Sequence, residues 1–103
     1  MAFIKNKNCL TIIAPNIKTI KHGFFTRIGG VSSGPFESLN CSYSCGDNIT
    51  HVKNNRMIVT SYMSVNQKHL IIPNQSHGNK VEEVTLKNIN NIFESDGLIS
   101  KIP

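Results

Sequence analysis

The sequence lacks any apolar run long enough to cross a membrane, and its first residues lack a signal-peptide pattern. A transmembrane helix needs about 20 mostly apolar residues, and no such run is present. Residues 1–10 mix Lys5 and Lys7 with asparagines, without a continuous apolar region or a cleavage motif. These absences argue against secretion and membrane insertion, so we expect a soluble, cytoplasmic protein.

Cysteine is scarce, and the three present are Cys9, Cys41 and Cys45. An odd number of cysteines without a secretion signal argues against a disulfide framework. The spacing of Cys41 and Cys45, with His51 nearby, is compatible with half of a zinc site, but a structural zinc needs four ligands and the chain has no second cysteine pair. We therefore expect small, buried, reduced thiols.

Acidic residues are also few, with six Asp and Glu against eleven Lys and Arg and a formal net charge of +5. Such a balance can indicate a nucleic-acid partner or an anionic substrate. The basic residues, however, are spread along the chain without clusters or interleaved aromatic residues. A basic, Asn-rich composition of the source genome explains the charge better, so no nucleic-acid partner is predicted.

The length of 103 residues fits one small domain with a modest core, predicted over residues 1–103. Residues 29–48 are rich in glycine, serine and asparagine and predict a long ordered loop, which in a compact domain usually carries function. Short apolar runs predict strands at residues 9–14, 21–26, 69–72, 81–86 and 97–99. Together with one helix, this order predicts an α+β fold with a mixed, largely antiparallel sheet.

The one good helix candidate runs from about Thr50 to about Val65, with Asn48 or Thr50 as its cap. The apolar residues that share one helical face are Val52, Val59 and Met63. Arg56 and Asn55 flank this face, and two interpretations stay open. Arg56 either extends into solvent, or it joins Asn55 in holding the preceding loop, for example through Asp47, because a buried guanidinium needs partners.

The segment Gln75-Ser76-His77-Gly78 is the most informative tetrapeptide. Imidazole is the commonest protein metal ligand and general base, and Gly78 allows a close backbone approach. Taken alone, the tetrapeptide favours an exposed histidine without a role. The Gln-x-His-Gly turn also predicts that His77 lies at the rim of a concave pocket rather than in the core.

The glycine-rich segment Gly29-Gly30-x-Ser32-x-Gly34 lacks both the P-loop ending and the dinucleotide-binding spacing. Its N–H groups could still bind an anion with help from Arg27. No Ser-His-Asp order, paired-carboxylate motif or nucleophile elbow is present. The residues alone therefore predict a fold and one well-placed histidine, but no reaction.

Several ordered segments together resemble one known family. They are His22-Gly23-Phe24-Phe25-Thr26-Arg27-x-Gly29-Gly30-Val31-Ser32, Gly34-Pro35-Phe36-x-Ser38-Leu39-Asn40, Gly46-Asp47, Val52, Asn55-Arg56, Gln75-x-His77-Gly78 and Ser95-Asp96-Gly97-Leu98-Ile99. This is the pattern of the YfiH-like family, also called the laccase-domain or multicopper polyphenol oxidase family. The resemblance covers nearly all of the chain after residue 20 and concerns the amino-terminal part of the family's domain.

The resemblance implies a layered α/β sandwich and an activity on purine nucleosides. Family members split adenosine, inosine, guanosine and methylthioadenosine with phosphate, and they deaminate adenosine; an older assignment is copper-dependent phenol oxidation. The implied metal is zinc, with copper as the alternative. It is held by the histidine of the Gln-x-His-Gly turn, which His77 matches, and by a cysteine and a second histidine further along.

By the same resemblance, the implied ligands are a purine nucleoside and phosphate. His77 and Arg27 are the candidate catalytic residues, His77 is the candidate metal ligand, and Arg27, Gly29, Gly30 and Asn40 are the candidate substrate-binding residues. Three protein ligands would leave an open zinc position for water or substrate, and cationic or N–H donors would stabilise the charge of phosphate.

The sequence departs from the family pattern at its carboxyl end. It stops at Lys101-Ile102-Pro103, before the family's metal-binding cysteine and second histidine, so it supplies one of three expected ligands. We therefore expect an incomplete site in this chain, and its status as an enzyme stays open. The alternatives are a fragment, a split or degraded gene product that persists as an inactive or binding remnant, or a part completed by a second chain or by self-association.

Overall fold

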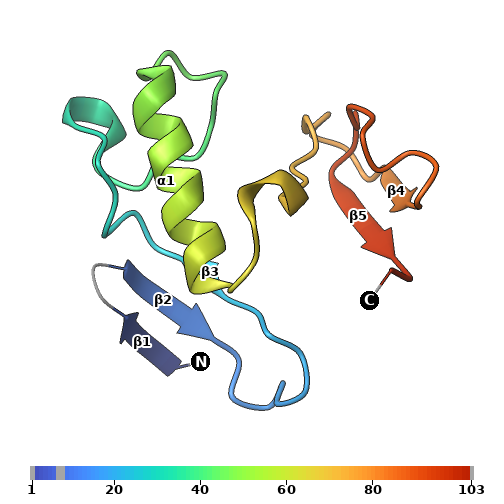
Figure 1. Cartoon of the computed structure of the whole chain (residues 1–103), viewed down its shortest axis with the longest axis horizontal. Helices are drawn as coiled ribbons and strands as arrows, with labels where there is room; N and C mark the ends of the chain where they lie inside the picture. Colours follow the sequence, from blue (N-terminus) through green and yellow to red (C-terminus); the bar gives the residue numbers. More distant parts are fainter. Residues whose placement is uncertain (1, 7–8, 103) are drawn as a thin grey trace. The chain divides into compact units, whose positions relative to one another are not determined.

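The structure is a computed structural model that describes residues 2–6 and 9–102 (Figure 1). The chain divides into two compact units, Met1–Leu70 and Ile71–Pro103. Each unit is described by itself, and the single domain expected over residues 1–103 stays a prediction. In the part of the chain that the structure describes, no helix is both long and apolar enough to span a bilayer.

The first unit contains a three-stranded antiparallel sheet with the order β1-β2-β3. β2 (Cys9–Ile13) confirms the strand predicted at 9–14, and β3 (Phe24–Phe25) is a short part of the strand predicted at 21–26. β1 (Ala2–Asn6) was not expected, because its lysine and asparagine content hides the strand pattern. β1 gains its backbone hydrogen bonds by pairing along the whole of β2.

The helix α1 (Ile49–Tyr62) confirms the predicted helix to within a few residues. The Asn48 side chain caps it by accepting the N–H groups of Thr50 and His51, which no earlier carbonyl can reach. At the other end, Ser64 adopts a left-handed φ of 58°, which turns the chain out of the helical path.

The buried face of α1 is more polar than its apolar stripe suggests. Val52 is fully buried as predicted, but its buried companions are Asn55 and Thr60. The Tyr62 ring meets Phe25 edge-on, with centroids 5.1 Å apart, and this contact joins the end of α1 to β3. The helix therefore buries both apolar and polar side chains along its length.

The loop expected over residues 29–48 is present, and its one regular element is a 3-10 turn, η1 (Gly34–Phe36). The strand predicted at 69–72 is wrong. The chain instead forms a second 3-10 turn, η2 (Gln67–His69), and leaves it without joining a sheet. The Asn66 side chain accepts the N–H of Lys68, and this local hydrogen bond favours a turn over an extended strand.

The second unit contains the strands β4 (Val81–Val84) and β5 (Gly97–Ser100), which confirm the strands expected at 81–86 and 97–99. The two strands pair in parallel rather than antiparallel. Val84 and Phe93 are the buried apolar residues of this unit, and Ser95 is fully buried as well. The α+β class is therefore confirmed, but the strands form two small sheets instead of one.

Candidate functional site

The turn that carries His77 is tied at its base to the segment before β5. Asn74 N–H donates to the Phe93 carbonyl at 2.8 Å, and Ser95 N–H donates to the Asn74 carbonyl at 3.0 Å. The Asn74 side chain also donates to Glu94 Oε1 at 3.2 Å. This parallel bridge between Asn74 and Glu94 fixes where the turn begins.

Asp96 organises the tip of the same turn. Its Oδ1 accepts His77 N–H at 2.7 Å, and its Oδ2 accepts the Ser76 hydroxyl at 2.7 Å and Gly78 N–H at 3.1 Å. The Ser76 hydrogen bond, aided by the N–H groups of Gly78 and His77, outweighs desolvation and lowers the pKa of the Asp96 carboxyl from its usual value. Asp96 is therefore an ionised anchor for three consecutive residues.

His77 adopts a left-handed backbone with φ 59°, a conformation that is uncommon for residues other than glycine. Its side chain is exposed, which confirms that it does not lie in a core. The sequence also placed it at the rim of a concave pocket. One groove in this unit is formed by residues 83–87, 101 and 102, and His77 does not line it, so its place at a pocket rim stays a prediction. The turn thus presents an imidazole to the outside, held by backbone contacts to Asp96.

In the first unit, the start of the loop closes on its middle around Ser38. The Arg27 carbonyl accepts the N–H groups of Ser38 and Leu39, at 3.0 and 2.8 Å, and also the Ser38 hydroxyl. The Arg27 side chain is exposed. Among the side chains that the structure describes, Lys80 and Glu82 form the salt bridge, and Arg27 takes part in none. The Arg27 guanidinium therefore has no carboxylate partner among them. It stays available to an anion.

Gly29 and Gly30 serve this loop closure directly. Both N–H groups donate to Ser38 Oγ at 3.2 Å. Gly29 has a φ of 108°, and a Cβ at Gly30 would lie 2.0 Å from the Ser38 carbonyl oxygen, so both positions require glycine. The N–H groups proposed from the sequence to bind an anion are therefore engaged inside the loop.

Asn55 of α1 binds the loop through its side-chain amide. Its side chain is fully buried. Its Oδ1 accepts Val31 N–H at 2.8 Å, and its Nδ2 donates to Ser32 Oγ at 2.9 Å and to the Asn40 carbonyl at 2.7 Å. One amide thus satisfies three loop groups, which confirms the interpretation that Asn55 holds the preceding loop.

Asp47 and Asn40 extend this network. Asp47 Oδ2 accepts the Ser32 hydroxyl and the Asn40 amide, and Oδ1 accepts Asn48 N–H. The Ser32 hydrogen bond is the main reason that the pKa of Asp47 is lowered. Asn40 also accepts Ser42 N–H at 3.2 Å through Oδ1. Both ends of the Asn40 side chain are therefore used within the loop.

Arg56 holds the loop as the second interpretation proposed, but through a different partner. Its Nε donates to the Cys41 carbonyl at 2.8 Å, and its guanidinium carbon lies 4.2 Å from the centroid of the Tyr43 ring. Asp47 instead binds Ser32 and Asn40. Arg56 therefore recognises a backbone carbonyl and an aromatic ring rather than a carboxylate.

The three cysteines are free thiols, as expected, but they are not all buried. Cys9 is buried, Cys41 is half-buried and Cys45 is exposed. Burial raises the pKa of the Cys9 thiol, and burial also raises that of Cys41 against the opposing charge of Arg56. Cys45 Sγ lies 3.1 Å from Asn40 Nδ2, so it takes part in the loop network.

Within residues 2–6 and 9–102, no three His, Cys, Asp or Glu side chains gather closely enough to hold a metal ion. His77 lies in the second unit, whereas Arg27, Gly29, Gly30 and Asn40 lie in the first. The last four belong to one hydrogen-bonded loop region. Their roles toward substrate and metal stay predictions.

Comparison with known proteins shows the family to which this chain belongs. Residues 21–103 match the family described as multi-copper polyphenol oxidoreductase laccase, and the chain belongs to that family. Its structure is similar to that of YlmD from Geobacillus stearothermophilus, with a TM-score of 0.79 and 28% identity. The match covers 97% of this chain and 40% of that one. The resemblance inferred from the sequence is confirmed.

Individual relatives have a more specific name. The chain is 36% identical over 70 residues to purine nucleoside phosphorylase YlmD of Bacillus subtilis, covering 68% of this chain and 25% of that protein. It is 42% identical over 60 residues to purine nucleoside phosphorylase YfiH of Escherichia coli, covering 58% and 24%. The chain thus spans about a quarter of the length of the curated relatives it matches.

Proposed function

We propose that these residues form part of a purine nucleoside phosphorylase that uses phosphate to split adenosine, inosine, guanosine or methylthioadenosine. Family membership and the names of the YlmD and YfiH relatives support the proposal. The structural observation that carries it is the His77 turn, because its strained backbone is held by Asp96 and presents an exposed imidazole. Backbone strain of this kind concentrates at functional sites. The free thiols agree with a cytoplasmic location.

The family description implies a metal, and the donor set of the described residues does not complete a site for one. His77 offers one imidazole, and the carboxylate bonded to its backbone, Asp96, uses both oxygens to hold the turn. Catalytic zinc normally has three protein ligands. We therefore propose His77 as one ligand of zinc, or alternatively copper, with the other ligands supplied by residues outside this set.

In the proposed reaction, a phosphate oxygen bonds to the anomeric carbon of the ribose while the glycosidic C–N bond breaks. The electron pair of that bond leaves with the purine, which then takes up a proton. Phosphate carries the charge that a protein must stabilise, and arginine suits it because its guanidinium donates two parallel hydrogen bonds. Arg27 is proposed for this role because its backbone is fixed by Ser38 and Leu39 while its side chain is free.

Phenol oxidation is a second candidate, favoured by the family's name as a polyphenol oxidoreductase. An inactive remnant is a third, favoured by the single candidate ligand within the described residues. The phosphorylase is preferred because the Bacillus subtilis and Escherichia coli relatives carry that name.

The test joins the 103 residues to the part of Geobacillus stearothermophilus YlmD that lies outside the match, and measures hypoxanthine release from inosine. We expect release that requires phosphate and that His77→Ala abolishes. His69→Ala removes an exposed histidine of the first unit and is the matched control. Phosphate-independent release, or full activity of His77→Ala, would refute the proposal. Oxidation of a phenol in place of nucleoside cleavage would favour the second candidate.

A further inference from the structure

The β4–β5 sheet is an unusual element to stand alone. Parallel strands are normally covered on both faces, and a two-stranded sheet is marginal without further packing. In the parallel register, Val81 lies beside Gly97, and Glu83 lies beside Ile99. On this face Val81 and Ile99 are 57% and 61% exposed. One face of the sheet therefore carries apolar side chains without a cover within the second unit.

The two outer edges of the sheet differ. Gly97 N–H donates to the Lys80 carbonyl, so the Gly97 backbone faces β4, and by alternation the Leu98 backbone faces away from β4. The outer edge of β4 is occupied in part, because Asn88 Nδ2 donates to the Glu83 carbonyl at 2.9 Å. β5 is paired with β4 alone in the described sheet. Its outer edge, which carries the Leu98 N–H and carbonyl, is the open edge.

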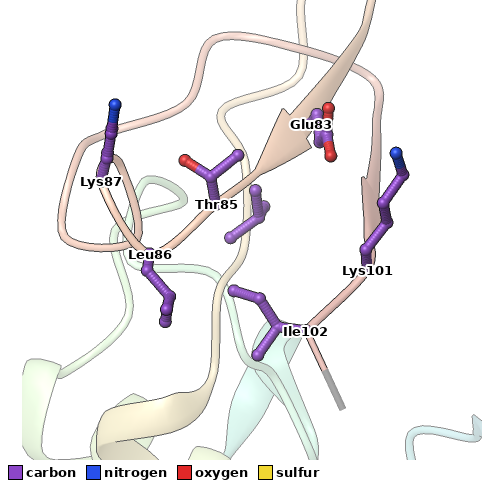
Figure 2. A pocket seen from close by; sticks show the side chains of 7 residues that line it. Glu83, Thr85, Leu86, Lys87, Lys101 and Ile102 are labelled. Atoms are coloured by element: carbon purple, nitrogen blue, oxygen red, sulfur yellow. The ribbon is translucent and has the colours of Figure 1, made fainter.

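A groove of about 580 Å³ lies just beyond the carboxyl ends of both strands, formed by residues 83–87, 101 and 102 (Figure 2). The Leu86 and Ile102 side chains lie toward one side of it, and the Lys87 and Lys101 side chains extend the other way (Figure 2). Leu86 is 78% exposed. Neither lysine has a carboxylate within salt-bridge distance among the described side chains. The groove is thus largely apolar, and its rim, called the basic rim below, carries two lysines and one carboxylate, Glu83.

We propose that the open edge of β5 and this groove form one docking surface for an extended polypeptide segment. The occupant is a segment of the family domain outside the matched part, which adds a strand along β5 and places apolar side chains on Leu86 and Ile102. The Geobacillus relative contains residues that could supply this segment, because the match covers 97% of this chain but only 40% of the Geobacillus chain. Strand addition supplies backbone hydrogen bonds, and the groove supplies specificity.

The basic rim specifies the occupant further. Lys87 and Lys101 flank the groove without neutralising partners, so the segment carries a carboxylate that reaches this rim. The proposal concerns binding alone and does not rest on the phosphorylase reaction. It holds whether the segment is continuous with these residues or belongs to a second polypeptide.

The test mixes the isotope-labelled 103-residue protein with a polypeptide made of the unmatched part of Geobacillus stearothermophilus YlmD. Sedimentation measures stoichiometry, and hydrogen exchange is followed at individual amides without substrate. We expect a one-to-one complex in which exchange at Leu98 N–H slows by about tenfold or more. A complex without protection at Leu98, no complex, or a homodimer that protects the same amide would overturn the proposal.

Two variants locate the surface. Leu86→Asp places a charge in the groove and should weaken the complex about tenfold or more. Ile49→Asp is the matched control, since Ile49 is 70% exposed on the first unit and should leave binding unchanged. Both side chains are exposed, so both variants should keep the circular dichroism of the parent. Equal binding by the two variants would refute the groove as part of the surface.

Discussion

The loop held by α1 and the turn held by Asp96 solve the same structural problem with different chemistry. In the first unit, the neutral amide of Asn55 is buried and satisfies three loop groups. In the second unit, the ionised Asp96 satisfies three groups of an exposed turn. When its partner is removed, a buried polar group stays without a hydrogen bond, whereas an exposed one can bind water. Removal of Asn55 should therefore lower the stability of the fold, whereas removal of Asp96 should mainly change the conformation of the turn.

The largest expected effect is that of Asn55→Ala. It removes the partner of the Val31 N–H and of the Asn40 carbonyl and one of the two partners of the Ser32 hydroxyl, so the free energy of unfolding should fall by about 3 kcal/mol. Chemical denaturation followed by the circular dichroism of α1 measures it. Asn54→Ala removes the exposed neighbouring amide and should change stability by less than about 0.5 kcal/mol. Equal effects of the two variants would remove the basis of the comparison.

Arg56→Ala should have the next largest effect. It deprives the Cys41 carbonyl of its donor and the Tyr43 ring of its cation, which should cost about 1–3 kcal/mol. Denaturation under the same conditions checks it, with Lys53→Ala as the control because Lys53 is an exposed cation of the same helix. A change within experimental error would show that the guanidinium is solvated rather than holding the loop.

Asp96→Ala should affect stability less than Asn55→Ala. The released donors of Ser76, His77 and Gly78 are exposed and can bind water, so the loss of stability should be small. The turn should instead become mobile, with backbone order parameters falling below about 0.6 at residues 76–78. Nitrogen-15 relaxation measures this motion. A rigid turn in the variant would mean that the Asn74–Glu94 bridge is sufficient to hold His77.

The smallest effect expected is a pH dependence from Asp47. Its folded pKa is lowered, so the stabilisation is present above the ordinary carboxyl pKa of about 4 and is lost as the pH falls through the folded value. Denaturation of the parent and of Asp47→Asn across this range should show that the variant lacks the component. Glu37→Gln alters an exposed carboxylate of the same loop and is the control. Parallel pH profiles for parent and Asp47→Asn would contradict the assignment.

Local sequence signals predicted the elements whose hydrogen bonds are local. The α1 helix follows from its apolar spacing and the Asn48 cap, and the long loop follows from its turn residues. The sequence could not predict β1, whose strand conformation comes from pairing with β2. The wrong prediction of a strand at 69–72 shows the opposite case. The apolar run there predicted a strand, but the local hydrogen bond of the Asn66 side chain favours the η2 turn.

The candidate site was predicted to a similar depth. The sequence singled out His77 as a candidate and offered a loop-holding role of Asn55 and Arg56 as one of two interpretations, because a histidine before glycine and polar residues beside an apolar stripe are visible in it. It did not identify Asp96 as the anchor of the turn, since the two are 19 residues apart in sequence. Nor did it show that Gly29, Gly30 and Asn40 are bonded inside the loop, because that depends on the approach of Ser38 and Asp47.

Zinc analysis of the isolated 103-residue polypeptide tests most directly the claim that these residues supply a single metal ligand. One imidazole does not hold zinc tightly against water, so equilibrium dialysis should recover far less than one zinc per chain. Base release from adenosine with phosphate should be absent, and His77→Ala should change neither result. Stoichiometric zinc that is lost in His77→Ala, together with clear nucleoside cleavage by the polypeptide alone, would contradict the account.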